Sequence, residues 1–501
     1  MKDNVTTKIL QLTTTAPRAE KPKDDSAFVP LPEALQITEP NDYKFLRDLI
    51  GFSQKWSPRS PKASHEAIAV HTLCAAAAGR VVFDYGARHR TTLYQFIVAP
   101  SSVYAKTSVA RIATELLDAA GLSRVTIGRA TPQSFFDQCL EKVPTDYESL
   151  SDEKKARIRE RLQSAAQRAW YAEEFGAWAV SMLREGSVSY EFRSLLLQIY
   201  DSPKVVEMST RTYGTLAMER PSLALLAVST YADVQKIAAA GSPFWRDGLL
   251  ARFDWITTEE TETHSNEMFP TGQRIFPQHL VEGLREYDDM LGRANVEIRP
   301  VVEKSQNGKD RTIRTEVVIT PQPEYVVLLS DEVRDAVHTY DSWLRDTIAA
   351  GLCEDLHSSY ARMADRTLRV ACLLASYEKR TVCSLRDFAK ARAIVERRRE
   401  FLHLTYRRLT DAAGEAERVQ RTDRILQFIA TQRTASLRDI QTKFRRSYPM
   451  GAAELQRELD ALVTSGEVKC VQVTPKRQVY AVDSDAVREL VATAAKRGKM
   501  V

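Results

Sequence analysis

Short apolar runs alternate with stretches of helical periodicity through the first half of the chain. LYQFIVAP (93–100) is rich in aromatic and β-branched residues and ends at a proline, as a buried strand does. Apolar residues then recur at helical spacing through VARIATELLDAAGL, until Gly121 stops the pattern. AWYAEEF, SLALLAVST (222–230) and LLARFDWIT (249–257) are further short apolar runs. Buried strands separated by helices predict a three-layer α/β domain with a parallel sheet.

Other segments follow different patterns. Residues 295–321 hold two strand-like runs, VEIRPVVE and RTIRTEVVIT, around Asn307-Gly308, a strong hairpin signal. Residues 331 to about 410 are helical in pattern throughout. After Glu415, three short helical stretches precede VKCVQV, the turn TPKR and QVYAV, and this order predicts a winged helix. The pattern therefore predicts six segments: a flexible tail (1–30), a helical N-terminal extension (31–90), an α/β core (91–330), a helical segment (331–412), a winged helix (416–485) and a basic tail (486–501).

Composition narrows the functional classes. A length of 501 residues suggests roughly three domains, and 44% hydrophobic with 27% charged residues is typical of a globular protein. The six cysteines form no CxxC pair, which argues against a structural zinc site. The longest apolar runs fall short of the ~18 residues that span a bilayer, so we expect a cytoplasmic protein with no membrane partner. The net charge of +5 is small, so only its distribution can argue for nucleic acid.

The loop after the first strand carries the first candidate chemistry. It reads Pro100-Ser101-Ser102-Val103-Tyr104-Ala105-Lys106-Thr107. A phosphate-binding loop has the pattern GxxxxGK[ST], in which backbone N–H groups wrap the phosphates, the lysine reaches them and the hydroxyl holds magnesium. Lys106 and Thr107 stand at a helix N-terminus as required, but Pro100 and Ala105 replace both glycines. An ordinary strand-to-helix turn with a solvated lysine is the alternative.

The later strand ends add three further marks in a consistent order. Glu173-Glu174 closes the second run, where nucleotide hydrolases place a magnesium-linked carboxylate and a carboxylate that polarises water. A solvated strand end is the alternative for this pair. Thr230 ends the third run and could orient that water. Arg252, in the fourth, is a candidate finger for a neighbouring subunit's nucleotide.

The series AKT, EEF, ST and ARFD resembles the AAA+ module of the minichromosome-maintenance helicases. It also resembles a group of helicase-like ATPases of phages and mobile elements that are often linked to primases. The resemblance covers about residues 60–410. It implies an AAA+ P-loop core with a helical lid (331–412), a basic β-hairpin insertion and a C-terminal winged helix. It further implies ATP and Mg²⁺ as cofactors, a homo-oligomeric ring, and single- or double-stranded DNA and a primase or replication protein as partners.

The resemblance also implies roles for individual residues. The nucleotide would be bound by Ser102, Ala105, Lys106, Thr107 and Ser108, and magnesium by Thr107 and Glu173. Glu174 would be the catalytic carboxylate, Thr230 the first sensor and Arg252 the finger acting in trans. In the lid, YARMADRTLRVACLLA places Arg362, Arg366 and Arg369 on one helix face, and Arg362 or Arg366 is the expected second sensor. A solvated basic stripe is the alternative for these arginines.

Basic residues indicate where DNA could bind. Phosphate contacts supply most of the non-specific affinity for DNA, and the expected contacts lie on the hairpin and near the wing: Lys304, Lys309, Arg311, Arg314, Arg445, Arg446, Lys476 and Arg477. The third helix of the winged segment bears Glu454, Glu458 and Asp460, which disfavours strong sequence reading in the major groove. The run 396–400 and the pair Arg407-Arg408 are expected to form a solvated helix face.

These features predict an ATP-dependent DNA motor, a ring-forming replicative-type helicase of a phage or mobile element. The departures from the phosphate-loop pattern keep a second hypothesis open. Val103 and Tyr104 bring side chains into a loop that should be bare, and Pro100 removes an N–H donor. Losing two or three contacts of about 1.5–3 kcal/mol each would weaken nucleotide binding by orders of magnitude. The alternative is therefore a non-hydrolysing AAA+-like DNA-binding scaffold or adaptor.

Overall fold

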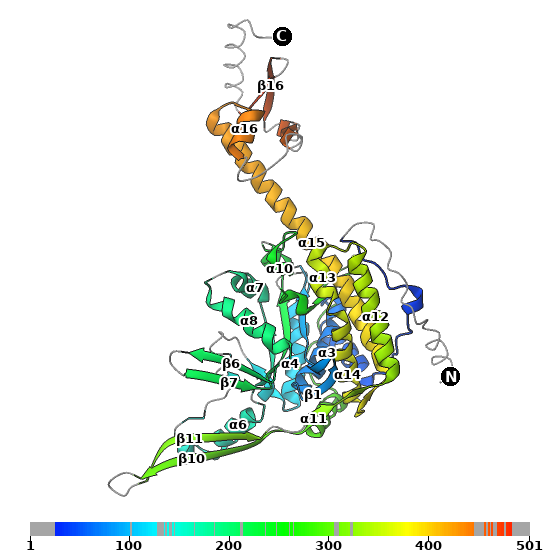
Figure 1. Cartoon of the computed structure of the whole chain (residues 1–501), viewed down its shortest axis with the longest axis vertical. Coiled ribbons are helices and arrows are strands. Elements are labelled where there is room, and N and C mark those ends of the chain that lie inside the picture. Colours follow the sequence, from blue (N-terminus) through cyan, green and yellow to red (C-terminus); the bar gives the residue numbers. More distant parts are fainter. Residues whose placement is uncertain are drawn as a thin grey trace. The chain divides into compact units, whose positions relative to one another are not determined.

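A computed structural model describes residues 26–100, 103–127, 135, 138–139, 143–144, 146–164, 166–184, 186–210, 214–235, 237–246, 248–259, 261–263, 265–304, 310–320, 324–444, 455–456, 459–460, 462–463, 468–474 and 477–482. The chain divides into two compact units, residues 1–410 and 411–501 (Figure 1). Each unit has its own hydrophobic core. Among the described residues, no helix combines the length and the apolar character needed to cross a bilayer.

A five-stranded parallel sheet forms the centre of the first unit. Its strand order is β4-β5-β8-β3-β9, and every neighbouring pair is parallel. All eight residues of β8 are buried, as expected for a strand covered on both faces. The predicted α/β class and parallel sheet are therefore confirmed. The strands are β3 (Tyr94–Val98), β4 (Thr126–Ile127), β5 (Gln167–Ala172), β8 (Ser222–Ser229) and β9 (Phe253–Ile256).

Helices cover both faces of this sheet. Figure 1 shows α7 and α8 on one side of it and α3 on the other. Helix α4 follows β3 directly and buries Val109, Ile112 and Leu116 along one face. Within the described residues up to 291, the helices are α2 (Lys44–Trp56), α3 (Lys62–Ala77), α4 (Lys106–Ala119), α6 (Asp152–Leu162), α7 (Phe175–Leu183), α8 (Val188–Tyr200), α9 (Tyr231–Gln235), α10 (Pro243–Arg246) and α11 (Gln278–Leu291). Short 3₁₀ turns occur at Glu33–Leu35, Ser123–Val125, Tyr147–Ser149 and Leu250–Arg252.

The segment after residue 330 is helical, as the pattern predicts. It holds α12 (Asp331–Ala349), α13 (Glu354–Tyr360), α14 (Met363–Tyr377) and α15 (Leu385–Gln432). The expectation that the segment is helical throughout is wrong at one place. Strand β14 (Val382–Cys383) lies between α14 and α15 and pairs in parallel with β13 (Leu328–Leu329), just before the segment. Helix α15 is continuous over 48 residues, so the helix expected near 422–432 is its final part and not a separate element.

Two pairs of strands lie where the sequence predicted none. The expected helical extension over 31–90 is wrong at its end, because β1 (Val81–Tyr85) and β2 (Ala87–Arg90) form a tight hairpin there. Gly86 takes a left-handed backbone with φ +69° between them, which lets the chain reverse. Strand β12 (Tyr325–Val326) pairs with β1 to complete a small sheet. The strands β6 (Val205–Thr210) and β7 (Gly214–Glu219) form a second hairpin just before β8.

The predicted antiparallel pairing of the two strands in 295–321 is confirmed, whereas the turn at Asn307-Gly308 lies outside the described residues. Strand β10 (Asn295–Lys304) pairs in antiparallel with β11 (Asp310–Thr320), with a register shift between Val301 and Val302. Figure 1 shows the pair as a long two-stranded ribbon.

The second unit combines the end of α15 with α16 (Leu437–Phe444) and a small antiparallel sheet. The sheet order is β15-β17-β16, from β15 (Ala435–Ser436), β17 (Arg477–Ala481) and β16 (Lys469–Thr474). The predicted pairing of VKCVQV with QVYAV is therefore confirmed. Most of the third helix expected in this unit lies outside the described residues.

Candidate nucleotide site

The register of the central sheet brings the predicted strand ends to one edge. Val98 of β3 pairs with Ser229 of β8, and Ala172 of β5 pairs with Ala227 of β8. The residues that follow these strands therefore emerge side by side at the carboxyl edge, which is where ligands bind in open α/β sheets. The Lys106 loop, the Glu173-Glu174 pair and Ser229-Thr230 thus meet at one place.

Lys106 is not a solvated lysine. Its side chain is only 7% exposed. Its ammonium donates to the carbonyl oxygens of Ala99 at 2.9 Å and Pro100 at 2.8 Å, at the start of its own loop. Burial lowers its pKa, and the Asp233 carboxylate opposes that shift. The loop therefore encloses the lysine that was predicted to reach the phosphates.

Neighbouring segments hold the loop in place. The N–H of Ala105 donates to the carbonyl of Arg59 at 3.1 Å, and the Ser60 hydroxyl donates to the carbonyl of Ala105 at 2.8 Å. The Tyr104 hydroxyl donates to the carbonyl of Glu262 at 3.1 Å. The bulky side chain that weakened the phosphate-loop pattern thus ties the loop to the segment after β9. Thr107 and Ser108 lie half-buried in the first turn of α4.

Asp233 organises the end of β8, and the sequence interpretation missed it. Its carboxylate accepts hydrogen bonds from the Ser229 hydroxyl at 2.9 Å, the Thr230 hydroxyl at 2.7 Å and the Thr230 N–H at 3.0 Å. Burial alone would raise the pKa of Asp233, but these hydrogen bonds and the charge of Lys106 lower it. The spacing Thr230-x-x-Asp233 at a helix start is a capping signal that could have identified it.

Gly176 packs the second strand end against the third. Its N–H donates to the Ser229 hydroxyl at 3.2 Å. A Cβ added at this position would lie 2.4 Å from the Ser229 oxygen and 2.7 Å from the Asp233 Cβ. Only a glycine therefore fits between the two strand ends.

The two acidic residues differ in backbone and in contacts. Glu174 is exposed and takes a left-handed backbone, φ +55°, at the N-cap of α7. A non-glycine residue in this region costs about 1–2 kcal/mol, and such strain is common at functional sites. Glu173 is also exposed, and an oxygen of its carboxylate lies 3.5 Å from an Arg111 nitrogen.

The donor set fits a magnesium ion that is bound mainly through phosphate. Such ions take one or two side-chain ligands and complete their shell with phosphate oxygens and water. The Thr107 hydroxyl and the Glu173 carboxylate could supply these ligands, once Glu173 leaves Arg111. Among the described residues, no three His, Cys, Asp or Glu side chains gather as a metal cluster of their own.

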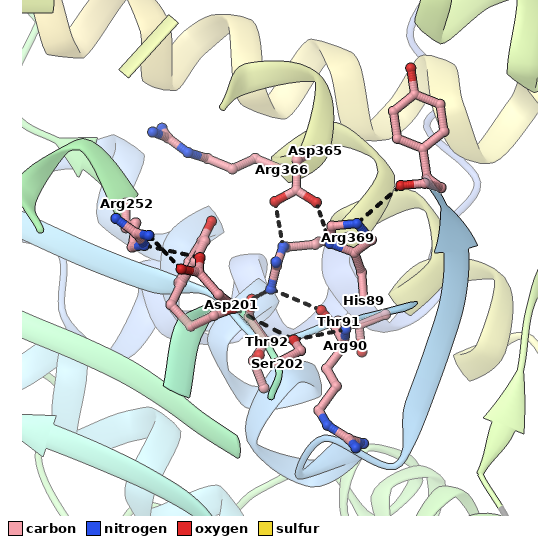
Figure 2. A network of polar contacts seen from close by, with 12 residues as sticks. His89, Arg90, Thr91, Thr92, Asp201, Ser202, Arg252, Asp365, Arg366 and Arg369 are labelled. Atoms are coloured by element: carbon pink, nitrogen blue, oxygen red, sulfur yellow. Dashed lines mark hydrogen bonds and ion pairs between the residues drawn. The ribbon is translucent and has the colours of Figure 1, made fainter. Parts of the chain in front are cut away.

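Arg252 is engaged within its own chain. It is 8% exposed, and two of its nitrogens donate to the Asp201 carboxylate at 2.6 and 3.2 Å. A third donates to the carbonyl of Gly248 at 2.9 Å. Figure 2 shows this guanidinium directed at Asp201. Reaching a neighbouring subunit's nucleotide would require Arg252 to leave Asp201.

Two of the three predicted lid arginines, Arg366 and Arg369 of helix α14, are core residues, so the alternative of a solvated stripe is wrong for them. Arg366 and Arg369 are each 1% exposed. Arg366 pairs with Asp254 of β9 at 3.2 Å. Arg369 pairs with Asp365 at 2.7 Å, as Figure 2 shows. Arg362 is half-buried and donates to the carbonyl of Ser358. Arg362 is thus the more accessible of the two second-sensor candidates.

The charged run on α15 is also largely internal, so the expected solvated face is wrong there. Arg398 and Arg399 are 1% and 0% exposed. Arg398 pairs with Glu66 of α3, and Arg399 pairs with Glu396 one turn earlier on α15. Arg408 is half-buried and contacts the segment after β9.

The expected DNA contacts lie largely beyond what the structure describes. Four of the expected DNA contacts lie outside the described residues: Lys309, Arg445, Arg446 and Lys476. The same holds for Ser102, which was expected to bind the nucleotide. Lys304, Arg311, Arg314 and Arg477 occupy strand positions, but the description does not extend to their side chains.

A pocket of about 460 Å³ lies at the opposite, amino edge of the sheet. Gln167, the first residue of β5, lines it together with Arg80 and Arg90. Arg80 is committed to Asp288 and Arg90 to Glu324. This pocket is separate from the predicted phosphate loop.

No protein-family model and no curated protein matches this sequence. The chemistry of the carboxyl edge is therefore inferred from its own residues.

Proposed function

We propose that this protein is an ATP-dependent DNA motor of the AAA+ class, a ring-forming replicative-type helicase of a phage or mobile element. One observation carries the proposal: three consecutive marks predicted from the sequence meet at one edge of the parallel sheet. They are Lys106 at the start of α4, Glu174 after β5 and Thr230 after β8.

The arrangement supports hydrolysis of a nucleoside triphosphate. The N-terminus of α4 attracts anions through its free N–H groups and its dipole. Lys106 would exchange the carbonyls of Ala99 and Pro100 for phosphate oxygens. Glu174 would accept a proton from the attacking water. The Thr230 hydroxyl donates to Asp233, so its lone pairs remain available to accept a hydrogen bond from that water.

Magnesium, when bound, would neutralise phosphate charge, with Thr107 and Glu173 as its side-chain ligands. The helices after residue 330 would form the lid over the nucleotide, and Arg362 would be its second sensor. Arg252 would act on a neighbouring subunit's nucleotide after release from Asp201.

DNA is the proposed partner because of the ribbon β10–β11 and the second unit. A two-stranded ribbon with Lys304, Arg311 and Arg314 in its sequence could follow a phosphate backbone. The end of α15, helix α16 and the antiparallel sheet β15-β17-β16 support a winged helix in the second unit. A primase or another replication protein would be a further partner.

The test is ATP hydrolysis with and without single- and double-stranded DNA. Hydrolysis stimulated by DNA should disappear in Lys106→Ala and Glu174→Gln. Exposed Arg334 on α12 offers a control, since Arg334→Ala should leave it unchanged. Retained hydrolysis in both site variants would contradict the proposal. DNA binding should weaken steeply with added salt if it depends on phosphate contacts.

A second candidate is a DNA-binding scaffold that does not turn over nucleotide. It is favoured by the two hydrogen bonds that Lys106 donates to carbonyls of its own loop, and by Pro100 and Ala105 in place of glycines. It predicts DNA binding without hydrolysis. Titration calorimetry with ATP, Mg²⁺ and an oligonucleotide distinguishes the two, because the scaffold should give no heat of nucleotide binding even at millimolar ATP.

A further inference from the structure

Arg408 of helix α15 reaches the edge of the candidate nucleotide site from a distant part of the chain. Its Nη1 donates to the Tyr231 hydroxyl at 2.8 Å. The same nitrogen lies 2.9 Å from both the carbonyl and the hydroxyl oxygen of Thr258. Its Nη2 donates to the carbonyl of Glu259 at 3.4 Å. One guanidinium thus joins α15 to the start of α9 and to the segment after β9.

The charge of Arg408 is held by neutral groups. Arg366 and Arg369 each pair with a carboxylate. Within the part of the chain that the structure describes, the oxygens that accept hydrogen bonds from Arg408 are all hydroxyls or carbonyls. Its positive charge is therefore not cancelled by a directly bound carboxylate, and it adds to the potential that would attract phosphate at this edge.

Arg408 also lies near Tyr104 of the Lys106 loop. Burial raises the pKa of Tyr104, and the charge of Arg408 opposes that rise. Arg408 is thus within electrostatic reach of the residue that ties the loop to Glu262.

The contact between Arg408 and Tyr231 constrains the residue next to Thr230. Tyr231 follows Thr230 in the chain, and its hydroxyl shares a hydrogen bond with the buried Thr257 hydroxyl as well as with Arg408. The Arg408 guanidinium lies 5.9 Å from the centroid of the Tyr231 ring. On its other side, Thr230 is held by Asp233. Thr230 therefore sits between two anchors, one of which comes from α15.

We propose that Arg408 is a positioning residue that fixes Thr230 and couples the position of helix α15 to nucleotide hydrolysis. The proposal rests on the function proposed above and adds a regulatory contact to the same site. Movement of α15 would release Tyr231, and Thr230 would then lose its fixed place beside the water.

Steady-state kinetics test the coupling. Arg408→Ala should lower kcat by about ten- to a hundredfold, as expected when a reacting group is misplaced, with KM changed less than about twofold. Arg408→Lys, which keeps the charge but has a single donor nitrogen, should recover part of the loss. The neighbouring Arg407 is exposed, so Arg407→Ala is the matched control. Equal kcat values in the two alanine variants would overturn the proposal.

A double-mutant cycle tests the route through Tyr231. Tyr231→Phe removes only the hydroxyl that Arg408 binds. If Arg408 acts through that hydroxyl, the double variant should be no slower than Arg408→Ala alone. Effects that multiply would show that the two residues act independently, and would contradict the proposal.

Hydrogen exchange of the nucleotide-free protein separates this proposal from the proposed function. Amides of residues 231–235 and 257–259 should exchange faster in Arg408→Ala than in the parent and in Arg407→Ala. Unchanged exchange would overturn the anchoring role, whatever the activity. If Arg408→Ala shows this change but the parent protein hydrolyses no ATP, the anchoring role stands and the motor is excluded.

Discussion

The Asp233 carboxylate holds Thr230 through two atoms of that residue, accepting from the hydroxyl at 2.7 Å and from the backbone N–H at 3.0 Å. This pairing fixes the rotation of the Thr230 hydroxyl and leaves its lone pairs free to accept. The turn from the end of β8 into helix α9 is therefore an ordered polar site and not a frayed strand end.

Removing the charge of Asp233 should slow nucleotide hydrolysis without weakening nucleotide binding. Asp233→Asn keeps the shape of the side chain but turns one acceptor oxygen into a donor. We expect kcat to fall by about a hundredfold, a typical loss for one misdirected polar group, with KM close to that of the parent. Thr230→Val should give a similar loss. A full parental rate in both variants would remove Thr230 from the mechanism.

Gly176→Ala should disturb the same site from the β5 side. The added Cβ would lie 2.4 Å from the Ser229 oxygen, closer than real contacts allow, so the end of β8 must shift. We expect lower kcat together with a lower melting temperature. Gly51 in α2 has open space around it, so Gly51→Ala is a control that should lower neither. Unchanged kinetics in Gly176→Ala would mean that the strand ends tolerate the shift.

Arg252 and Asp201 offer a test of the finger role. If Arg252 acts in trans, Asp201→Ala should free it, and hydrolysis should stay at or above the parental rate while Arg252→Ala abolishes it. Arg252→Ala should also lower the free energy of unfolding by about 1.5–3 kcal/mol, through loss of charged hydrogen bonds. Urea denaturation measures the stability of each variant, and hydrolysis rates measure its activity. Equal loss of activity in Asp201→Ala and Arg252→Ala would assign Arg252 a purely structural role.

The pair Arg369–Asp365 should be essential to folding and not to chemistry. Arg369 donates to Asp365, to the carbonyls of Arg90 and Thr92, and lies 4.4 Å from the Tyr200 ring centroid. Arg369→Ala leaves those groups without this partner and should cost about 3–5 kcal/mol in unfolding free energy. The double variant with Asp365→Asn should recover part of that cost in urea denaturation. A loss below 1 kcal/mol would contradict the prediction.

Because three histidines are buried, we expect the folded protein to lose stability in mild acid. Burial lowers the pKa of His65, His71 and His403 to about 4. Histidines in the unfolded chain bind protons near pH 6.5, so between pH 6.5 and 4 the unfolded state holds more protons than the folded state. The free energy of unfolding should therefore fall as pH is lowered through this window, by up to about 1.4 kcal/mol per pH unit for each histidine.

Urea denaturation at pH 7, 6 and 5 checks this expectation. His71→Leu should reduce the slope of unfolding free energy against pH by about a third, since it removes one of three such groups. Replacement of exposed His338 by Gln should leave the slope unchanged. A slope that is the same in His71→Leu and in the parent would contradict the assignment.

The central sheet could be predicted from the sequence because its strands are apolar on both faces. SLALLAVST becomes a fully buried strand, and its neighbours carry similar runs. Lys106, Glu174 and Thr230 each follow a strand of the sheet in the sequence. Because parallel strands share one carboxyl edge, strands predicted to be parallel are enough to bring these three residues together. The hairpins β1–β2 and β6–β7 were missed because their strands are short and mix polar with apolar residues.

The burial of the arginines could not be predicted from the local sequence pattern. Arg366 and Arg398 look solvated on a helical wheel, but their partners Asp254 and Glu66 lie 112 and 332 residues away. Only the fold brings such charges together. Asp233 was within reach of sequence reasoning, since it sits three residues after Thr230 at a helix start. Arg408 was not, because nothing near it in sequence marks its contact with Tyr231.

The lysine that folds back onto Ala99 and Pro100 has a practical consequence. A buried ammonium left without acceptors would make the ligand-free protein fragile and dependent on nucleotide for its folding. Here the loop's own oxygens solvate that charge. We therefore expect the protein to fold without added nucleotide, and a phosphate bound at this loop would compete for Lys106 with the loop's two carbonyls rather than with bulk water.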